Sequence, residues 1–167
     1  MRNIVLIGMP AVGKSTIGVL LAKSLGFSFI DTDLIIQQQT GRLLQAIIDA
    51  DGLDAFCEAE EKAICSVDIE GGAVIATGGS AVYSRKAMLH LKKHGDVYYL
   101  SLPTEEISRR LKNIKTRGIA MRPGDTLEDV FKRRCELYRE FADEVIECHG
   151  KQAEETIEEI CRGYRKN

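Results

Sequence analysis

The chain carries at residues 3–16 the stretch NIVLIGMPAVGKST, in which an apolar, β-branched run meets a glycine-rich turn. This stretch contains the G-x-x-x-x-G-K-[ST] pattern of a phosphate-binding loop, and a helix-forming segment follows it at 17–25. Gly8 and Gly13 permit backbone angles that turn successive N–H groups inward, and the following helix directs its positive end to the same place. Lys14 is suited to contact the β- and γ-phosphates, and the Ser15 hydroxyl to ligate Mg²⁺. A chance glycine-rich turn is the alternative, but the filled pattern between a strand and a helix predicts a nucleotide phosphate site.

The composition is typical of a soluble globular protein. The 167 residues suffice for one domain, and a content of 44% hydrophobic and 29% charged residues fits neither a disordered nor a membrane chain. The first apolar residues belong to the strand before the phosphate loop, so no signal peptide is expected, and no run approaches the ~20 residues of a spanning helix. A net charge of −2 without a basic block argues against nucleic acid as a partner. Five cysteines without C-x-x-C spacing indicate reduced thiols in a cytoplasmic protein.

Strand and helix patterns alternate along the whole chain. Such alternation predicts a three-layer α/β/α fold with a five-stranded parallel sheet, in which ligands bind where the strands end. Thr126, with Asp129 three residues later, is a predicted N-cap, and the last strand is expected at an edge. The predicted strands cover 3–7, 28–30, 73–76, 97–100 and 144–147, and the predicted helices cover about 17–25, 34–39, 43–50, 54–67, 84–93, 103–115, 126–141 and 154–164.

Polar residues follow two of the predicted strands. Asp31 and Asp33 are two residues apart, so in an extended segment they point to the same side. One is suited to organise Mg²⁺ through water and the other to accept the proton of an attacking hydroxyl. An Asp turn that caps the next helix is the alternative. The turn at 77–80 (Thr-Gly-Gly-Ser) offers backbone N–H groups to substrate oxygens, although this signal is weak by itself.

Arginines mark three further places in the second half of the chain. Arg110, next to another arginine, is suited to stack on an adenine base, and a solvated helix face explains it equally well. The basic, turn-rich segment 116–124 has the composition of a mobile lid, from which Arg117 or Arg122 would contact the γ-phosphate; a flexible surface loop is the alternative. Arg134, on a late helix, is suited to hold the carboxylate of an acidic substrate.

Together these residues resemble the shikimate kinase family of P-loop folds over nearly the whole chain. Residues 8–16 match the family's phosphate loop, and 31–33 match its D-[ST]-D element, in which the first Asp supports Mg²⁺ and the second holds the substrate hydroxyls. Residues 77–82 resemble its T-G-G-G-A-V turn. The run that begins at Arg134 resembles its R-x-x-L-Y…A-D element, whose arginine binds the substrate carboxylate, and Arg110 falls on its adenine-stacking arginine.

The resemblance implies that ATP, with Mg²⁺, phosphorylates a hydroxyl of a small cyclic polyol acid on a single domain, 1–167, that acts as a monomer. It also implies a lid at about 112–124 and an acceptor-binding region at about 33–62. The family's lid arginine lies at a fixed spacing from the adenine-stacking arginine, and Arg117 has this spacing from Arg110. Arg122 stands in an R-P dipeptide like that of the family's lid, but the spacing favours Arg117. The expected nucleotide-binding residues are Gly8, Ala11, Val12, Gly13, Lys14, Ser15, Thr16 and Arg110, the metal-binding residues Ser15 and Asp31, the acceptor-binding residues Asp33, Cys57, Glu60, Gly78, Gly79, Ser80 and Arg134, and the catalytic residues Lys14, Asp33, Arg117 and Arg122.

Two departures from the family pattern fall in the acceptor region. The family has F-R-x-x-E where this chain has Phe56 to Glu60, so that Cys57 replaces a carboxylate-binding arginine. Losing a charged hydrogen bond of about 1.5–3 kcal/mol weakens binding by about ten- to a hundredfold, unless another cation takes its place. Ser80 replaces a third glycine; either a positive φ strains it, or its hydroxyl alters the polarity of the pocket.

Two other functions are compatible with a phosphate loop. A nucleoside monophosphate kinase needs additional arginines after the second strand, where the segment 34–60 offers Arg42 as its cation. A regulatory P-loop switch is the other, but the chain lacks the N-K-x-D sequence that reads guanine.

Overall fold

The structure is a computed structural model that describes residues 1–68, 70–113 and 119–164. Within these residues, five parallel strands form one sheet in the order β2-β3-β1-β4-β5. All residues of β1 and β3 are buried, because helices cover both faces of the sheet. The predicted strands are confirmed, and the last lies at an edge as expected. The strands are β1 (Asn3–Ile7), β2 (Ser28–Asp31), β3 (Ala73–Ala76), β4 (Gly95–Ser101) and β5 (Glu144–Glu147).

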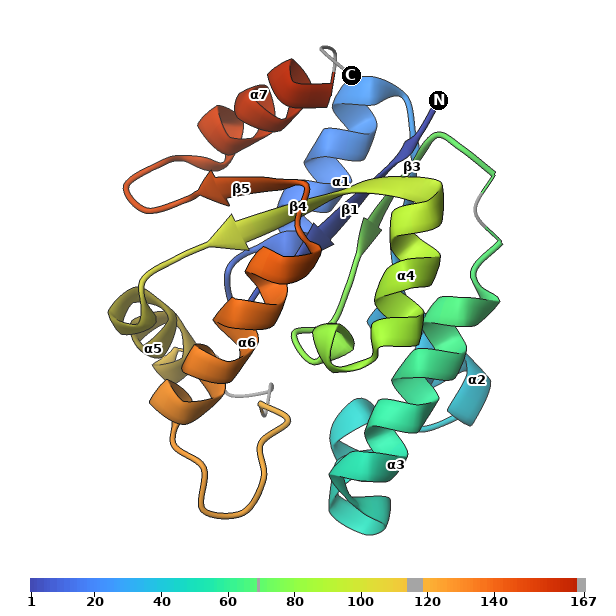
Figure 1. Ribbon diagram of the computed structural model, residues 1–167, viewed down its shortest axis with the longest axis vertical. Coiled ribbons are helices and arrows are strands. Elements are labelled where there is room, and N and C mark those ends of the chain that lie inside the picture. Colours follow the sequence, from blue (N-terminus) through green and yellow to red (C-terminus); the bar gives the residue numbers. More distant parts are fainter. Residues whose placement is uncertain (69, 114–118, 165–167) are drawn as a thin grey trace.

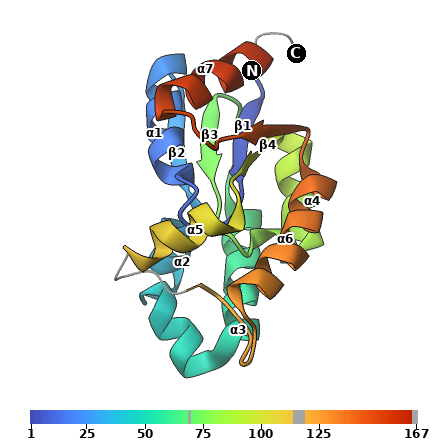
Figure 2. The ribbon, with the colours of Figure 1, turned by 90° about the vertical axis from the view of Figure 1, so that its left-hand side faces the viewer.

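Helices form a layer on each face of the sheet (Figure 1 and Figure 2). On one face α1 (Lys14–Leu25) and α7 (Ala153–Tyr164) pack together, and α4 (Arg85–His94) and α6 (Leu127–Phe141) cover the other. The predicted three-layer α/β/α fold is therefore confirmed. In the described part of the chain, no helix combines the length and the apolar character needed to span a bilayer.

The remaining helices lie beyond the carboxyl ends of the strands, in the lower part of Figure 1. The two helices predicted at 43–50 and 54–67 form one element, α3, which is kinked at Gly52 (φ 87°, ψ 172°). Helices α1 and α2 begin earlier than predicted, because Gly13 and Asp31 occupy their N-cap positions. These elements are α2 (Thr32–Thr40), α3 (Leu44–Ser66), the 3-10 turn η1 (Ala81–Tyr83), which the sequence does not predict, and α5 (Thr104–Lys112).

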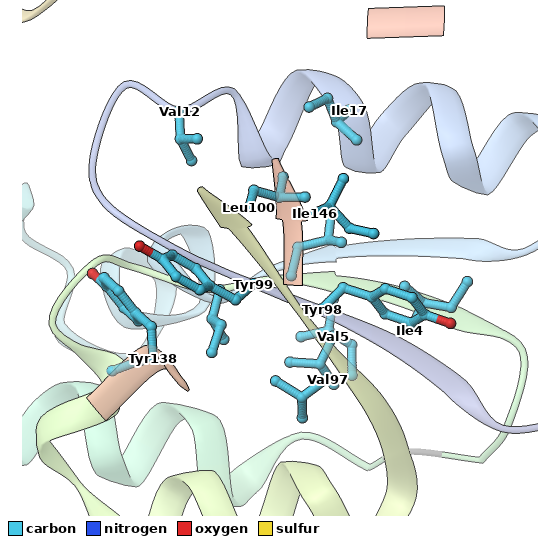
Figure 3. Close-up of a cluster of buried hydrophobic side chains, with 14 of the residues drawn as sticks. Ile4, Val5, Val12, Ile17, Val97, Tyr98, Tyr99, Leu100, Tyr138 and Ile146 are labelled. Carbon is cyan, nitrogen blue, oxygen red and sulfur yellow. The ribbon is translucent and has the colours of Figure 1, made fainter. Parts of the chain in front are cut away.

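The core attaches the phosphate loop and α6 to the sheet (Figure 3). Val12 and Ile17 are buried and point from the loop and α1 toward β4, where Leu100 lies. Tyr99 of β4 stacks on Tyr138 of α6, with the ring centroids 4.9 Å apart. Burying a side chain of this size contributes about 1.5–3 kcal/mol. These contacts therefore hold the loop and α6 in position at the carboxyl end of the sheet.

Candidate active site

The loop after β1 has the backbone conformation of an anion-binding nest. Gly8 (φ 147°), Ala11 (φ 67°) and Gly13 (φ 99°) all have a positive φ. At Gly8 space also excludes a side chain, because a Cβ would lie 2.6 Å from the carbonyl oxygen of Leu100. A non-glycine residue in this region, as at Ala11, is strained by about 1 kcal/mol, and such strain clusters at functional sites. The sequence pattern names Ala11 as a loop residue but does not reveal this strain.

Lys14, the first residue of α1, lies over the phosphate loop. Its ammonium donates to the backbone carbonyls of Gly8 at 2.7 Å and Met9 at 2.8 Å. Both carbonyls follow β1 directly, so the ammonium lies at the carboxyl end of the sheet, as the pattern predicts. The side chain of Val12 is buried in the core, so this residue offers a ligand its backbone, and Thr16 lies exposed on the first turn of α1.

Ser15 and Asp31 form the expected pair. The Ser15 hydroxyl donates to Asp31 Oδ2 at 2.9 Å. Asp31 Oδ1 accepts the N–H of Asp33 at 3.0 Å and caps α2, so the helix-cap interpretation of this carboxylate is confirmed. The pair fits Mg²⁺, which takes one or two protein oxygens together with water and phosphate oxygens. In the described residues no group of three or more His, Cys, Asp or Glu is placed to hold a metal ion, so an ion at this pair would complete its coordination with water and nucleotide.

The two glycines after β3 lie where the acceptor-side residues meet. A Cβ on Gly78 would lie 2.5 Å from Glu60 Oε1 and 2.9 Å from Asp33 Oδ1. A Cβ on Gly79 would lie 2.8 Å from Arg134 Nη1, and as close to the proline ring of the phosphate loop. Two carboxylates, a guanidinium and the phosphate loop therefore converge on this turn, although they are far apart in the sequence.

Ser80 is not strained. Its φ of −88° lies in the right-handed region, and its hydroxyl donates to Glu60 Oε2 at 2.6 Å. The expectation that this hydroxyl alters the polarity of the pocket therefore holds, and the expectation of a positive φ does not. Glu60 is 2% exposed. Burial, with a contribution from the Asp33 carboxylate, raises the pKa of Glu60 to about 7, against the hydrogen bond from Ser80 and the charges of Arg134 and Lys14. Glu60 Oε1 has no hydrogen-bond partner among the residues described.

Arg134 is a buried cation on α6. The predicted cap is confirmed, since Thr126 and Asp129 form a capping box that begins this helix. Arg134 is 1% exposed; its Nε donates to the Tyr83 hydroxyl at 3.2 Å and its Nη2 to the carbonyl of Ala120 at 2.7 Å. No carboxylate in the described ranges forms an ion pair with it. Buried charges are normally paired, so this position suits an anionic group of a ligand.

Cys57 lies on the acceptor side, near two cations. Burial raises the pKa of its thiol, and the Glu60 carboxylate raises it further, whereas Arg134 and Arg122 act in the opposite sense. The charge of Arg122 therefore contributes to lowering the pKa of the Cys57 thiol. Arg117, the arginine favoured for the lid, lies outside the described residues.

Arg110, and not its neighbour Arg109, lies against the phosphate loop. Its Nη1 donates to the carbonyl of Ala11 at 3.3 Å, and its Nε donates to Glu106 at 3.0 Å. Arg109 also pairs with Glu106, but its side chain is 72% exposed. Arg110 is thus the member of this pair that is placed beside the loop.

Two tyrosines to which the sequence patterns assign no role support this site. The Tyr138 hydroxyl donates to the carbonyl of Gly79 at 2.6 Å. Tyr83 accepts from Arg134, whose guanidinium carbon lies 5.3 Å from the centre of the Tyr83 ring. Tyr138 is four residues after Arg134 on the same helix face, which was a usable signal. The sequence around Tyr83 contains no comparable signal.

Comparisons with known proteins agree with this geometry. A family model described as shikimate kinase matches residues 10–164. A shikimate kinase of Thermodesulfovibrio yellowstonii is 36% identical over 168 residues, covering 99% of this chain and 96% of that protein. One from a type A strain of Clostridium botulinum is 40% identical over 170 residues, covering 99% of this chain and 98% of that protein. Among solved structures, shikimate kinase from Acinetobacter baumannii in complex with shikimate superposes with a TM-score of 0.91 at 31% identity, covering 100% of this chain and 94% of that one. With its phosphate loop, fold and near full-length match, the chain belongs to the shikimate kinase family of phosphotransferases, which use ATP and Mg²⁺.

Proposed function

We propose that the protein transfers the γ-phosphate of ATP to a hydroxyl of a small polyhydroxy acid, with shikimate, the ligand of the Acinetobacter baumannii structure, as the first candidate. The observation that carries this proposal is the environment of Arg134. Its guanidinium is buried and lies beside Gly79 and the phosphate loop, with no ion-pair partner among the described carboxylates. A substrate carboxylate would supply that partner.

The proposed roles follow the arrangement of charges. Lys14 neutralises the charge that spreads over the transferred phosphoryl group, and Asp33 orients or deprotonates the attacking hydroxyl. Ser15 ligates Mg²⁺ and Asp31 supports it through water. The ion, when bound, neutralises phosphate charge. The positive-φ backbone of the loop supports its role in holding the phosphates.

The roles at the nucleotide end are part of the same proposal. Arg110, which contacts the loop, covers the adenine. Of the two lid candidates, Arg117 is the proposed phosphate-side arginine, because it has the spacing from Arg110 that the family's lid arginine has. We further propose one kinase domain that acts as a cytoplasmic monomer, and size-exclusion chromatography checks the monomer.

A nucleotide kinase is less well supported than a hydroxy-acid kinase. Recognition of a nucleoside monophosphate calls for arginines in the segment after β2. Arg42, the cation of that segment, pairs with Asp51 and donates to the carbonyl of Ala46, with its side chain 38% exposed. It is therefore committed to a surface contact.

An acceptor panel tests the proposal. ADP release is measured with ATP, Mg²⁺ and, separately, shikimate, quinate, CMP and AMP. We expect release that depends on a hydroxy acid. No acceleration by either acid would contradict the proposal, and acceleration by CMP or AMP would favour a nucleotide kinase.

Two variants of α6 make the same test residue-specific. Arg134→Met is expected to raise the KM for the acid by about ten- to a hundredfold, because a charged hydrogen bond is lost. Lys132→Met removes the same charge from an exposed position on that helix and should leave the KM unchanged.

A further inference from the structure

A second polar cluster lies toward the amino end of the sheet, whereas the candidate active site lies at its carboxyl end. Asp96 is the second residue of β4, and Tyr98, two residues later, faces the same side of the sheet. Glu144, the first residue of β5, pairs in register with Tyr98, so their side chains are neighbours on that face. Figure 3 shows the Tyr98 ring extending toward Ile4 and away from Tyr99. The cluster is therefore separate from the phosphate and acceptor sites.

Two oxygen atoms of this cluster are buried without a hydrogen-bond partner. They are the hydroxyl oxygen of Tyr98 and Oδ2 of Asp96, and nothing in the described part of the chain bonds to either. Tyr98 is 0% exposed. Arg2 donates to Oδ1 of Asp96 at 2.7 Å, so its Nε is engaged on the other oxygen of that carboxylate. Because buried polar atoms normally have a partner, both oxygens indicate a site for one.

Glu144 carries a charge that its surroundings disfavour. A Cβ on Gly163 would lie 2.6 Å from Glu144 Oε2 and 3.0 Å from Oε1, so the carboxylate lies against the last turn of α7. That turn is at the negative end of the helix dipole, which repels an anion. Glu144 has no ion-pair partner among the described cations. A carboxylate in this position favours a bound cation.

The neighbouring tyrosines report the same negative environment. Burial raises the pKa of the Tyr98 hydroxyl, and the carboxylates of Glu144 and Asp96 raise it further. Burial and Asp96 also raise the pKa of Tyr164, on the last turn of α7, against the effect of its hydrogen bond to the backbone of Arg2. Oxygen atoms from β4, β5 and α7 therefore meet in this region.

The ion pairs around the cluster leave one negative charge over. Arg2 pairs with Asp96 at 2.7 Å. Lys92 pairs with Asp143, which precedes β5, at 2.6 Å. Glu144 is the carboxylate left without a described counterion. Oxygen ligands suit hard cations rather than transition metals. No group of three or more His, Cys, Asp or Glu in the described ranges is placed to hold a metal ion, which argues against a multivalent cation.

We propose that a monovalent metal cation, K⁺ or Na⁺, binds between β4, β5 and α7, with the Glu144 carboxylate, Asp96 Oδ2 and the Tyr98 hydroxyl oxygen as its ligands. Glu144 supplies the charge, and the two buried oxygens gain the partner that no described residue gives them. The ion joins the edge strand and the last helix to the centre of the sheet. This inference is independent of the proposed function, because none of the three residues belongs to the candidate active site.

Urea unfolding of the full chain in different chloride salts tests this inference. Potassium, sodium and tetramethylammonium chloride are compared at about 200 mM, so that charge screening is equal and the organic cation is too large for the site. A cation that binds only the folded state lowers the unfolding equilibrium constant by a factor that grows with its concentration. We expect this constant to be at least about fivefold lower in potassium or sodium chloride than in tetramethylammonium chloride.

Variants make the test residue-specific. Glu144→Gln should remove the difference between the salts, and Tyr98→Phe should reduce it. The Tyr98 variant should fold, because it loses a hydroxyl without a described partner. Glu147→Gln, the same change at an exposed position of β5, should keep the wild-type difference.

Three outcomes would overturn the inference. One is an equal unfolding constant in all three salts, which is also the result expected if Arg165 or Lys166, outside the described residues, supplied the charge. Another is a difference that persists in Glu144→Gln, because the cation then binds elsewhere. The third is stabilisation by calcium chloride that depends on Glu144 while potassium and sodium have no effect, because the site would then be one for a divalent ion.

Discussion

The substitution Glu60→Gln is expected to change how the stability of the protein depends on pH. Burial raises the pKa of the Glu60 carboxyl from its ordinary value of 4.5 to about 7. The folded protein therefore keeps this proton over a range in which the unfolded chain has released it. The free energy of unfolding thus falls as the pH rises from about 4.5 to about 7, and the loss is complete above that range. Glutamine keeps the shape, can accept from Ser80 and has no proton to lose.

The size of the effect follows from the two pKa values. Each pKa unit is worth about 1.4 kcal/mol, so the difference between 4.5 and about 7 amounts to ~3 kcal/mol in all. Part of it is lost below pH 5, where the carboxyl is already titrating in the unfolded chain. About 2–3 kcal/mol remains between pH 5 and pH 8.5. Titrating groups that do not interact with Glu60 are shared by the two proteins and cancel in the comparison.

Urea unfolding of the wild type and Glu60→Gln at pH 5 and pH 8.5 measures this difference. The variant should gain about 2–3 kcal/mol on the wild type between the two conditions. Glu61→Gln is the matched control on the same helix: a hydrogen bond from Ser84 lowers the pKa of the Glu61 carboxyl, so it titrates below this interval. If the wild type and Glu60→Gln show the same pH dependence to within about 0.5 kcal/mol, the reasoning about Glu60 is refuted.

Three further predictions concern the phosphate end of the site. Lys14→Ala should lower kcat by at least about a hundredfold, because the negative charge of the transition state loses the cation that stabilises it. The circular dichroism spectrum should be unchanged. A kcat near the wild-type value would contradict this role of Lys14. Gly8→Ala should lower the free energy of unfolding by more than about 3 kcal/mol, because its Cβ would lie 2.6 Å from a carbonyl of β4. The control Gly26→Ala, at a position with a positive φ but open space, should lower it by only about 1 kcal/mol. Equal losses in the two variants would argue against the clash at Gly8. Asp31→Asn should raise the Mg²⁺ concentration that gives half-maximal rate about 10–100-fold. Thermal stability should change little, because Asn caps a helix as well as Asp does. An unchanged Mg²⁺ requirement would mean that the hydrogen bond from Ser15 to Asp31 serves structure alone.

The strands and the phosphate loop could be predicted because their signals are local. The apolar run before Gly8 and the fixed spacing to Lys14 specify a strand, a turn and a helix without reference to the rest of the chain. The cap at Thr126 is local as well, and it is the start of the helix that carries Arg134. The order of elements then brings the carboxyl ends of the strands to one edge.

The details of the acceptor side depend on tertiary contacts and could not be predicted. Whether Ser80 is strained depends on its backbone angle, and its bond to Glu60 joins the residue that precedes η1 to α3. The raised pKa of Glu60 results from burial, which no short motif reports. The contact of Tyr83 with Arg134 likewise joins two elements that sequence patterns describe separately.

Transfer of a labelled phosphoryl group tests the central claim most directly. The protein is incubated with Mg²⁺, ATP carrying ¹⁸O in its γ-phosphate and a hydroxy-acid acceptor, and the products are identified by mass spectrometry. The account predicts the label on the acceptor, with the amount strongly reduced in Asp33→Asn. Label that stays in ATP, or that appears only in inorganic phosphate, would contradict it.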